Sequence, residues 1–217
     1  AAVSTIGNVS SALGYGIGFD RFVDLYKEPS LVDRREVSNT GAWKLYFEQD
    51  ITVVLPLAED VNEVALAWLR EEEKAPWFLF LWALDPHDPY FPPDRYDRWR
   101  DPGYDGKIDG SSESIRRVRG EADVQRLIDL YDGEIAYTDA QFGLLVDELK
   151  ATGLYDDTLI VVVGDHGEAF GDHGDFVHGH LAYDEIMHVP MIMKFPSEPP
   201  LRPFPIHGSH QANGREA

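Results

Sequence analysis

Several kinds of residue are absent or scarce in this chain. Its 217 residues include no cysteine, which excludes disulfides, cysteine-bound zinc and a thiol nucleophile within this stretch. The longest purely apolar run extends only from Trp77 to Leu84, far short of the roughly 20 residues that a membrane-spanning helix needs. The sequence therefore predicts no transmembrane segment.

Basic residues are also few. The chain has 19 Lys and Arg against 39 Asp and Glu, which gives a formal net charge of −20. Nucleic-acid binding depends on a basic surface that releases counterions, so nucleic acid is excluded as a partner. The acidic excess fits a protein that holds a hard cation or one that works in salt, and composition does not choose between the two.

The hydrophobic content of 43% is enough for a folded core, and the length fits one domain. The chain begins Ala1-Ala2-Val3, without an initiator methionine. We expect it to be a piece of a longer protein. Its compartment stays open: a leader upstream would make a soluble periplasmic or extracellular protein, and the oligomeric state is not readable from the sequence.

Apolar patterns predict helices and strands in alternation. Asp60 and Glu63 form a capping-box pattern at the start of a helix that should end near Glu73. A longer helix is expected over residues 122–150, with an apolar stripe that includes Leu127, Ile135 and Leu149 and with Gly153 placed to end it. The expected strands are Ala2–Ile6, Trp77–Leu84, Leu159–Val163 and Val189–Phe195. This order predicts an α/β fold with a mainly parallel sheet sandwiched by helices, in which the first three of these strands are buried.

Two segments lack a regular pattern. Residues 95–120 are polar and should form an excursion with little regular structure. Residues 197–217 carry several prolines and no periodicity, and are expected to form an irregular tail. The predicted folded unit therefore comprises residues 1–196.

Polar residues follow the predicted strands, where open α/β sheets place their ligands. Asp165 and His166 lie in the sequence G-D-H-G-E directly after the strand Leu159–Val163. On an irregular turn both side chains can reach one metal ion, and calcium, magnesium, manganese and zinc all stay open. A surface turn rich in small polar residues is the alternative.

Histidines supply the remaining candidates. His87 lies between two prolines in D-P-H-D-P-Y and is suited to an anionic ligand or to general acid catalysis, unless it simply faces solvent. The run from Gly171 to His180 contains three histidines, His173, His178 and His180. Such a cluster can bind metal or neutralise an oxyanion. His188, His207 and His210 are expected to be structural.

Four motifs in this order resemble the sulfatase family of the alkaline phosphatase superfamily. They are F-L-F-L-W-A-L-D-P-H-D-P-Y from Phe78, Y-D-G-E-I-A-Y-T-D from Tyr131, L-I-V-V-V-G-D-H-G-E-A-F-G-D-H-G from Leu159 and H-G-H-L-A-Y-D-E-I-M-H-V-P-M-I-M-K-F-P from His178. The resemblance implies a metal-dependent sulfuric ester hydrolase that acts on a small-molecule or glycan sulfate ester. It further implies that Asp165 and His166 are metal ligands, most simply of Ca²⁺, and that His87 and His178 are catalytic residues that contact the sulfate group.

The chain also departs from that family. The nucleophile motif, Cys or Ser followed by x-P-x-R, is missing, as are the preceding Asp pair and the C-terminal subdomain. We expect the formylglycine nucleophile to lie upstream and this incomplete catalytic domain to be inactive alone. Two alternatives stay open: a phosphonate or phosphate ester hydrolase, which His166 favours, and a non-catalytic anion-binding module.

Overall fold

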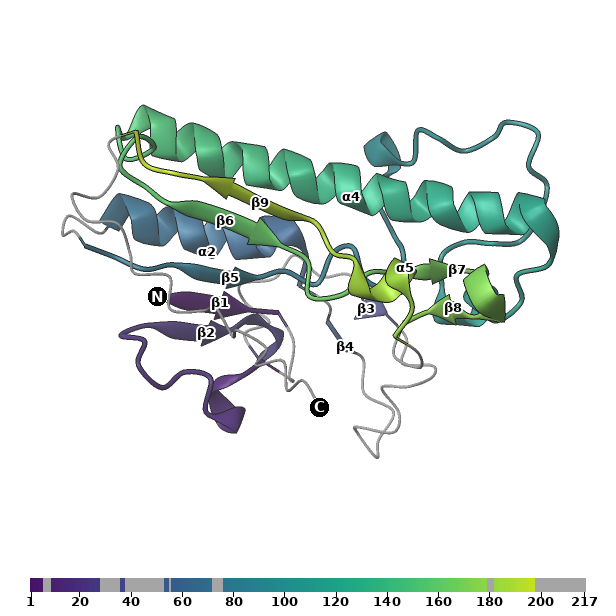
Figure 1. Ribbon diagram of the computed structural model, residues 1–217, viewed down its shortest axis with the longest axis horizontal. Helices are drawn as coiled ribbons and strands as arrows, with labels where there is room; N and C mark the ends of the chain where they lie inside the picture. Colours follow the sequence, from purple (N-terminus) through teal and green to yellow (C-terminus); the bar gives the residue numbers. More distant parts are fainter. Residues whose placement is uncertain are drawn as a thin grey trace, which may run out of the picture.

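The computed structural model describes residues 1–5, 9–27, 36–37, 53–54, 56–71, 76–178 and 182–197. Before residue 58 the described residues form strands and short 3-10 turns, and after it α-helices are interspersed with strands (Figure 1). The helices are α2 (Ala58–Glu71), α3 (Ser112–Ile115), α4 (Gly120–Ala151) and α5 (Asp184–Met187). The strands are β1 (Ala2–Ser4), β2 (Phe22–Asp24), β3 (Glu36–Val37), β4 (Val53–Val54), β5 (Phe80–Trp82), β6 (Ile160–Val163), β7 (Ala169–Phe170), β8 (Phe176–Val177) and β9 (Met191–Lys194).

A three-stranded parallel sheet packs against α2 (Figure 1). Its strand order is β2-β1-β5, and Val3 of β1 is in register with Val23 of β2 and Leu81 of β5. Strand β1 is fully buried, as a central parallel strand should be. This parallel sheet, with helices packed on it, confirms the predicted α/β fold class.

Helix α2 begins two residues earlier than the sequence suggests. Asp60 is not the residue that precedes the helix; its carboxylate instead reaches back to accept a hydrogen bond from the Leu57 amide, at 2.6 Å. A second carboxylate, that of Asp85 in the loop after β5, accepts a hydrogen bond from the Ala58 amide at 2.7 Å. These bonds satisfy amides that have no partner inside the helix. They also tie the start of α2 to the loop after β5.

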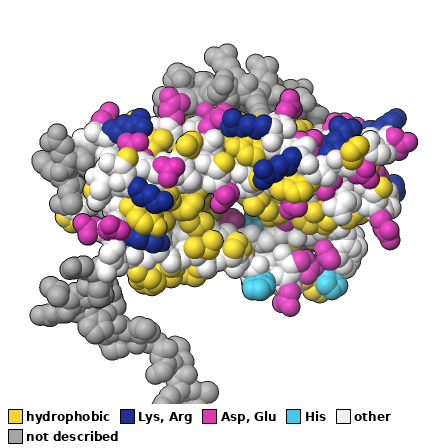
Figure 2. Space-filling view, turned by 90° about the horizontal axis from the view of Figure 1, so that it is seen from above, with side chains coloured by type: hydrophobic (Ala, Val, Ile, Leu, Met, Phe, Trp, Pro, Cys, Tyr) yellow, Lys and Arg dark blue, Asp and Glu magenta, His cyan; other side chains and the backbone are white. Residues whose placement is uncertain are grey.

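Helix α4 is the longest element and joins separate parts of the core. Near its beginning, Leu127 and Leu130 belong to a cluster around Tyr90. Near its end, Leu145 and Leu149 pack with α2 and with apolar residues of β5 and β6. The predicted apolar stripe of α4 is therefore largely confirmed, although Ile135 is exposed. The side of the molecule on which α4 lies shows acidic and basic side chains interspersed with apolar ones (Figure 2).

Strands β6 and β9 form a separate antiparallel pair beside the parallel sheet (Figure 1). Ile160 packs toward the cluster at the end of α4. Most of the pair is nevertheless exposed on both faces: Val161, Val163, Met191 and Met193 form one face, and Val162 and Ile192, on the same face as Ile160, are exposed as well. The prediction that Leu159–Val163 is a buried strand is therefore wrong, because the described part of the chain packs only against the Ile160 end of the pair.

The strand predicted at Trp77–Leu84 is shorter and less buried than expected. Only Phe80–Trp82 pairs with β1, and Phe78 is largely exposed. Among the described residues, none of the helices combines the length and apolar character of a membrane span.

The polar excursion after Pro93 contains little regular structure, as predicted, but it is not a loose surface loop. Ile108, Ile115 and Val118 are buried against α4 and Tyr90. The Tyr90 amide donates a hydrogen bond to the Gly110 carbonyl, at 2.9 Å. A Cβ atom on Gly110 would lie 1.9 Å from the Tyr90 carbonyl oxygen, so only glycine fits this close approach. The excursion therefore fixes the segment that carries His87.

Candidate functional site

The candidate side chains lie on three segments that directly follow strands, and these segments come together in the fold. His87 follows β5, Asp165 and His166 follow β6, and His178 follows β8 directly. The rings of His87 and His178 lie 4.7 Å apart between centroids and meet edge to face. The rings of His166 and His178 are stacked at 4.0 Å. The structure thus gathers all three imidazoles, which come from segments far apart in the sequence, into one cluster.

Glu168 holds His178 in place. The imidazole Nδ1 of His178 lies 3.1 Å from Oε1 of Glu168, while the hydroxyl of Tyr90 donates a hydrogen bond to Oε2 at 2.6 Å. Both Tyr90 and Glu168 are buried. The hydrogen bond that His178 donates to the Glu168 carboxylate raises the pKa of His178 above its usual value, against the opposing effect of burial. A carboxylate in this place stabilises the protonated imidazole and so favours contact with an anion.

The burial of Tyr90 completes this arrangement. Burial, reinforced by the negative charge of Glu168, raises the pKa of the Tyr90 hydroxyl. This hydroxyl therefore stays protonated and acts as a hydrogen-bond donor. Glu168 and Tyr90 lie within the quoted motifs, but the sequence pattern gave neither of them a role. The signal that could have found them is a carboxylate and a hydroxyl placed next to candidate histidines.

Asp165 and His166 are more accessible than the other members of the cluster. The side chain of Asp165 is 53% exposed and that of His166 is 32% exposed. The Asp165 carboxylate lies 3.7 Å from Nε2 of His166 and accepts a hydrogen bond from the His166 amide at 3.0 Å. One carboxylate oxygen and one ring nitrogen therefore face the same space. They fit two positions of a divalent metal site, although a Ca²⁺ ion takes about six to eight oxygen ligands.

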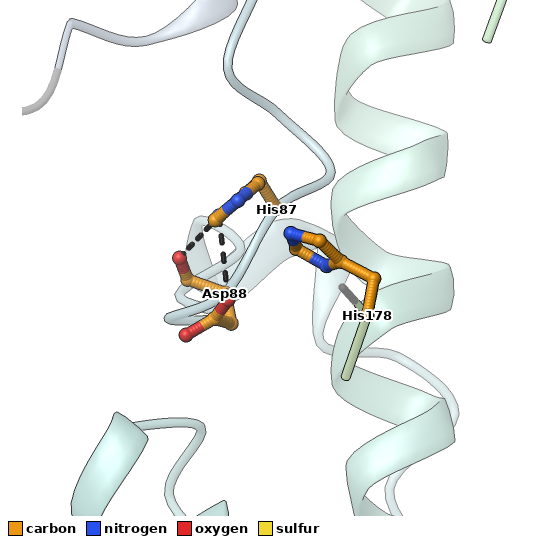
Figure 3. A group of neighbouring side chains, drawn as sticks. All are labelled: His87, Asp88 and His178. Atoms are coloured by element: carbon orange, nitrogen blue, oxygen red, sulfur yellow. Dashed lines mark hydrogen bonds and ion pairs between the residues drawn. The ribbon is translucent and has the colours of Figure 1, made fainter. Parts of the chain in front are cut away.

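A second group could also hold a metal ion. One ligand atom each from His87, Asp88 and His178 lies within 4.8 Å of the others. Figure 3 shows the His87 ring above the Asp88 carboxylate, with the His178 ring approaching from the opposite side. Asp88 Oδ2 also accepts a hydrogen bond from the Ser112 hydroxyl at 3.3 Å. Asp88 was not among the residues singled out from the sequence.

The turn after β6 needs glycine. A Cβ atom on Gly167 would lie 2.0 Å from the Glu185 carbonyl oxygen of α5, and the Gly167 amide donates a hydrogen bond to the Ile186 carbonyl at 2.7 Å. This close approach locks the segment with Asp165 and His166 against α5.

The remaining histidines lie elsewhere. His173 stacks on Tyr183 and contacts Glu185 at 2.7 Å. His188 is exposed at the end of α5. His180, His207 and His210 lie outside the described residues. Glu134 is buried and accepts a hydrogen bond from the Phe91 amide at 2.6 Å, whereas Asp139 is exposed on α4.

The fold and the site together define an α/β protein that gathers imidazoles and carboxylates beyond the ends of its strands, as hydrolases of anionic esters do. Comparison with known proteins gives the family. The Sulfatase family model matches residues 5–210, which is most of the chain and extends past Pro196. This chain belongs to the sulfatase family, whose members generally use a divalent metal.

Individual relatives agree with this assignment. The arylsulfatase of Clostridium perfringens is 28% identical over 150 residues, which cover 63% of this chain and 31% of that protein. Human iduronate 2-sulfatase is 32% identical over 116 residues, which cover 52% of this chain and 21% of that protein. The chain thus spans about a fifth to a third of the length of these relatives.

A solved structure shares the fold. The phosphonate monoester hydrolase of Agrobacterium radiobacter superimposes with a TM-score of 0.51 at 26% identity, over 64% of this chain and 34% of that one. Its named activity, hydrolysis of phosphonate monoesters, differs from that of the sulfatases.

Proposed function

We propose that this chain forms the anion-binding part and some of the metal-binding part of a sulfuric ester hydrolase. The convergence of His87, His166 and His178 at the ends of separate strands carries the proposal, because three neighbouring imidazoles can offer several hydrogen bonds to one small anion. Membership of the sulfatase family supports sulfate as that anion. The substrate would be a small-molecule or glycan sulfate ester.

The two catalytic roles fall to His87 and His178. Glu168 accepts from Nδ1 of His178, so the Nε2 atom of this ring is left to face the substrate. In the protonated form, Nε2–H donates a hydrogen bond to a sulfate oxygen and offsets charge that builds on the leaving oxygen. His87 is held in the same way through Nδ1, which lies 2.6 Å from the Asp88 carbonyl oxygen. The two rings would thus both donate hydrogen bonds to the ester from one side.

Asp165 and His166 would bind the divalent metal. Bound there, the metal supplies Lewis-acid stabilisation of the sulfate oxygens. The acidic composition and the family favour Ca²⁺, although the nitrogen of His166 also suits Mg²⁺, Mn²⁺ or Zn²⁺. Further oxygen ligands and the formylglycine nucleophile would come from residues outside this chain, which contains no cysteine.

A second candidate function uses the same site. The presence of His166 next to Asp165, together with the phosphonate monoester hydrolase neighbour, favours hydrolysis of a phosphonate or phosphate ester. A third alternative is an anion-binding module without catalysis. These three candidate functions predict different results in one set of assays.

The test compares hydrolysis of an aryl sulfate and an aryl phosphonate monoester by a protein that carries this chain together with the family's nucleophile motif. We expect the sulfate to be the better substrate. The variants His87→Asn and His178→Asn should each lower kcat by about 10²- to 10³-fold, the loss typical of a removed charge-stabilising donor. The variant His188→Gln, which alters an exposed imidazole outside the cluster, should leave kcat unchanged.

Other outcomes separate the alternatives. Faster hydrolysis of the phosphonate would replace the proposed activity with the second candidate. Sulfate binding without turnover, measured by calorimetry in the protein with the nucleophile motif, would support the third alternative, an anion-binding module without catalysis. Full activity of both histidine variants would contradict the proposed roles of these side chains.

A further inference from the structure

Val177, the residue directly before His178, has an unusual backbone conformation. Its φ angle is +62°, in the left-handed region that a β-branched residue rarely adopts. In the hairpin formed by β7 and β8, the other residues with a positive φ are Gly171, His173 and Gly174, which lie in the turn, whereas Val177 lies at the end of a strand. Such a conformation persists only where the surrounding structure enforces it, and it is concentrated at functional sites.

The pairing of β7 with β8 brings Glu168 next to His178. Ala169 pairs with Val177 in an antiparallel register. Continuing that register by one position places Glu168 opposite His178, and Nδ1 of His178 lies 3.1 Å from the Glu168 carboxylate. The hairpin therefore determines which partner the His178 ring meets.

Successive side chains at the end of β8 face the same part of the core. Phe176 and Val177 both pack against the apolar cluster around Tyr90. His178 meets the same region through Glu168, whose other carboxylate oxygen accepts a hydrogen bond from the Tyr90 hydroxyl at 2.6 Å. In an extended strand, however, successive side chains point to opposite faces. The left-handed backbone at Val177 breaks this alternation and lets neighbouring side chains reach one region.

We propose that Val177 is a positioning residue for His178. The branched side chain of Val177, packed against the cluster around Tyr90, holds the backbone in its unfavourable conformation. That conformation directs the His178 ring onto Glu168 and leaves Nε2 facing the anion. The catalytic consequence rests on the proposed function, in which His178 contacts the sulfate group. The effect on ring orientation does not, and it can be measured without a substrate.

Three substitutions at Val177 test the catalytic consequence, in a protein that carries this chain together with the family's nucleophile motif. Val177→Ala keeps a Cβ atom, which opposes a positive φ, but loses the methyl groups that hold the backbone in place. We expect its kcat on an aryl sulfate to fall about 10²-fold, the loss typical of a misplaced catalytic group. Val177→Gly adopts the left-handed conformation without steric cost, so its loss should be smaller. Val177→Ile keeps the branched side chain and should stay within about threefold of the unaltered kcat.

Val124→Ala is the matched control. Val124 is also half-buried against the cluster around Tyr90, but it lies in the regular helix α4. Its truncation removes the same two methyl groups from the same cluster, so it reports the effect of core packing alone and should leave kcat unchanged. In a His178→Asn background, Val177→Ala should lower kcat no further, because the ring that Val177 positions is gone.

Ring orientation is measured in the 217-residue chain by NMR. The Nδ1–H proton of His178, sheltered in its hydrogen bond to Glu168, should give a slowly exchanging signal. His178→Asn removes this signal and so assigns it. We expect the signal to persist in Val177→Ile and in Val124→Ala, and to be lost in Val177→Ala.

Three results would overturn the proposal: full kcat in Val177→Ala, an equal loss of kcat in Val124→Ala, or an unaltered His178 signal in Val177→Ala. Failure of the proposed function looks different. If the protein does not hydrolyse a sulfate ester but the His178 signal still depends on Val177, the positioning role stands and only the proposed activity is lost. If His178→Asn lowers kcat and Val177→Ala does not, the activity stands and the positioning role is lost.

Discussion

At the scale of single residues, Asp24 shows how a buried carboxylate can link stability to pH. Its Oδ1 accepts a hydrogen bond from the Ser11 amide at 3.1 Å, and Oδ2 accepts one from Lys27 at 2.9 Å as well as one from the Ser11 hydroxyl. Burial by itself raises the pKa of Asp24, but these hydrogen bonds outweigh it and leave the pKa below its usual value.

Because the pKa of Asp24 is lower in the folded chain than in the unfolded one, its stabilising contribution is present above the unfolded value of about 3.9. That contribution is lost as the pH falls through the folded pKa. We therefore expect Asp24→Asn to lower the free energy of unfolding by about 1.5–3 kcal/mol at pH 7, the usual range for hydrogen bonds to a charged group. Urea unfolding at pH 7 and at pH 3 measures the difference.

The difference between the unaltered chain and Asp24→Asn should shrink at pH 3, which is below the unfolded pKa of about 3.9, because the contribution of the Asp24 charge is lost progressively below that value. The matched control is Asp20→Asn, which changes an exposed carboxylate nearby in the sequence and should change stability little at either pH. An equal loss at both pH values would show that the Asp24 charge plays no part.

The sequence pointed to the candidate site residues but not to the residues that hold them in place. His87, Asp165 and His166 could be found because they follow predicted strands in motifs of small and polar residues. His178 could be found because it lies in a run that is dense in histidine. Glu168 could not be assigned its role from the sequence, because its partner Tyr90 lies 78 positions away and meets it only through the folding of the loop after β5. Contacts of this range have no local sequence signal.

At the scale of elements, one ion pair joins the excursion to α4. The guanidinium of Arg126 donates two parallel hydrogen bonds to the Asp97 carboxylate, at 2.5 and 2.7 Å, and the Arg126 side chain is only 6% exposed. Both residues line a pocket of about 650 Å³ between the excursion and α4. Breaking a buried pair leaves one charge without compensation, which is costlier than removing both charges.

We expect Asp97→Ala to lower the free energy of unfolding by about 3 kcal/mol, because Arg126 would remain buried without its partner. The double variant Asp97→Leu with Arg126→Met should recover most of that loss. Chemical denaturation of the three proteins measures the effect. A double variant as unstable as Asp97→Ala would mean that the pocket needs these groups for reasons other than charge.

The elements themselves were predicted with uneven success. The bounds of α4 differ from the predicted helix by only one or two residues, because a long apolar stripe and Gly153 mark it clearly. The packing of the excursion was not predicted: Ile108, Ile115 and Val118 are isolated apolar residues in a polar segment, and isolated residues carry no periodicity. Tertiary contact with α4 decides their burial.

At the scale of the whole molecule, the exposed face of β6 and β9 opposes the effect of the net charge. Val161, Val163, Met191 and Met193 form an apolar face on a chain of charge −20. Repulsion between copies keeps such a chain apart at low salt, whereas added salt screens charge but leaves apolar attraction in place. We expect self-association of the chain, followed by sedimentation velocity, to increase with salt concentration.

Replacing Val161 and Met191 by threonine should reduce that association, while changing the free energy of unfolding by no more than about 0.5 kcal/mol, as is usual for exposed positions. Threonine suits a strand, so β6 and β9 should persist. The control is Leu144→Thr, which alters an exposed leucine on α4. Association that decreases equally in the control, or not at all in the paired variant, would show that this face is not responsible.

The length of α4 has a consequence for how the chain unfolds. The helix has 32 residues, about 48 Å at 1.5 Å per residue, and it contributes to the core around Tyr90 at one end and to the core shared with α2 at the other. Neither core can open fully while its half of the helix stays in place. Amide protons along the middle of α4 should therefore exchange with solvent through one cooperative opening, so that the two ends of the molecule melt as a single unit.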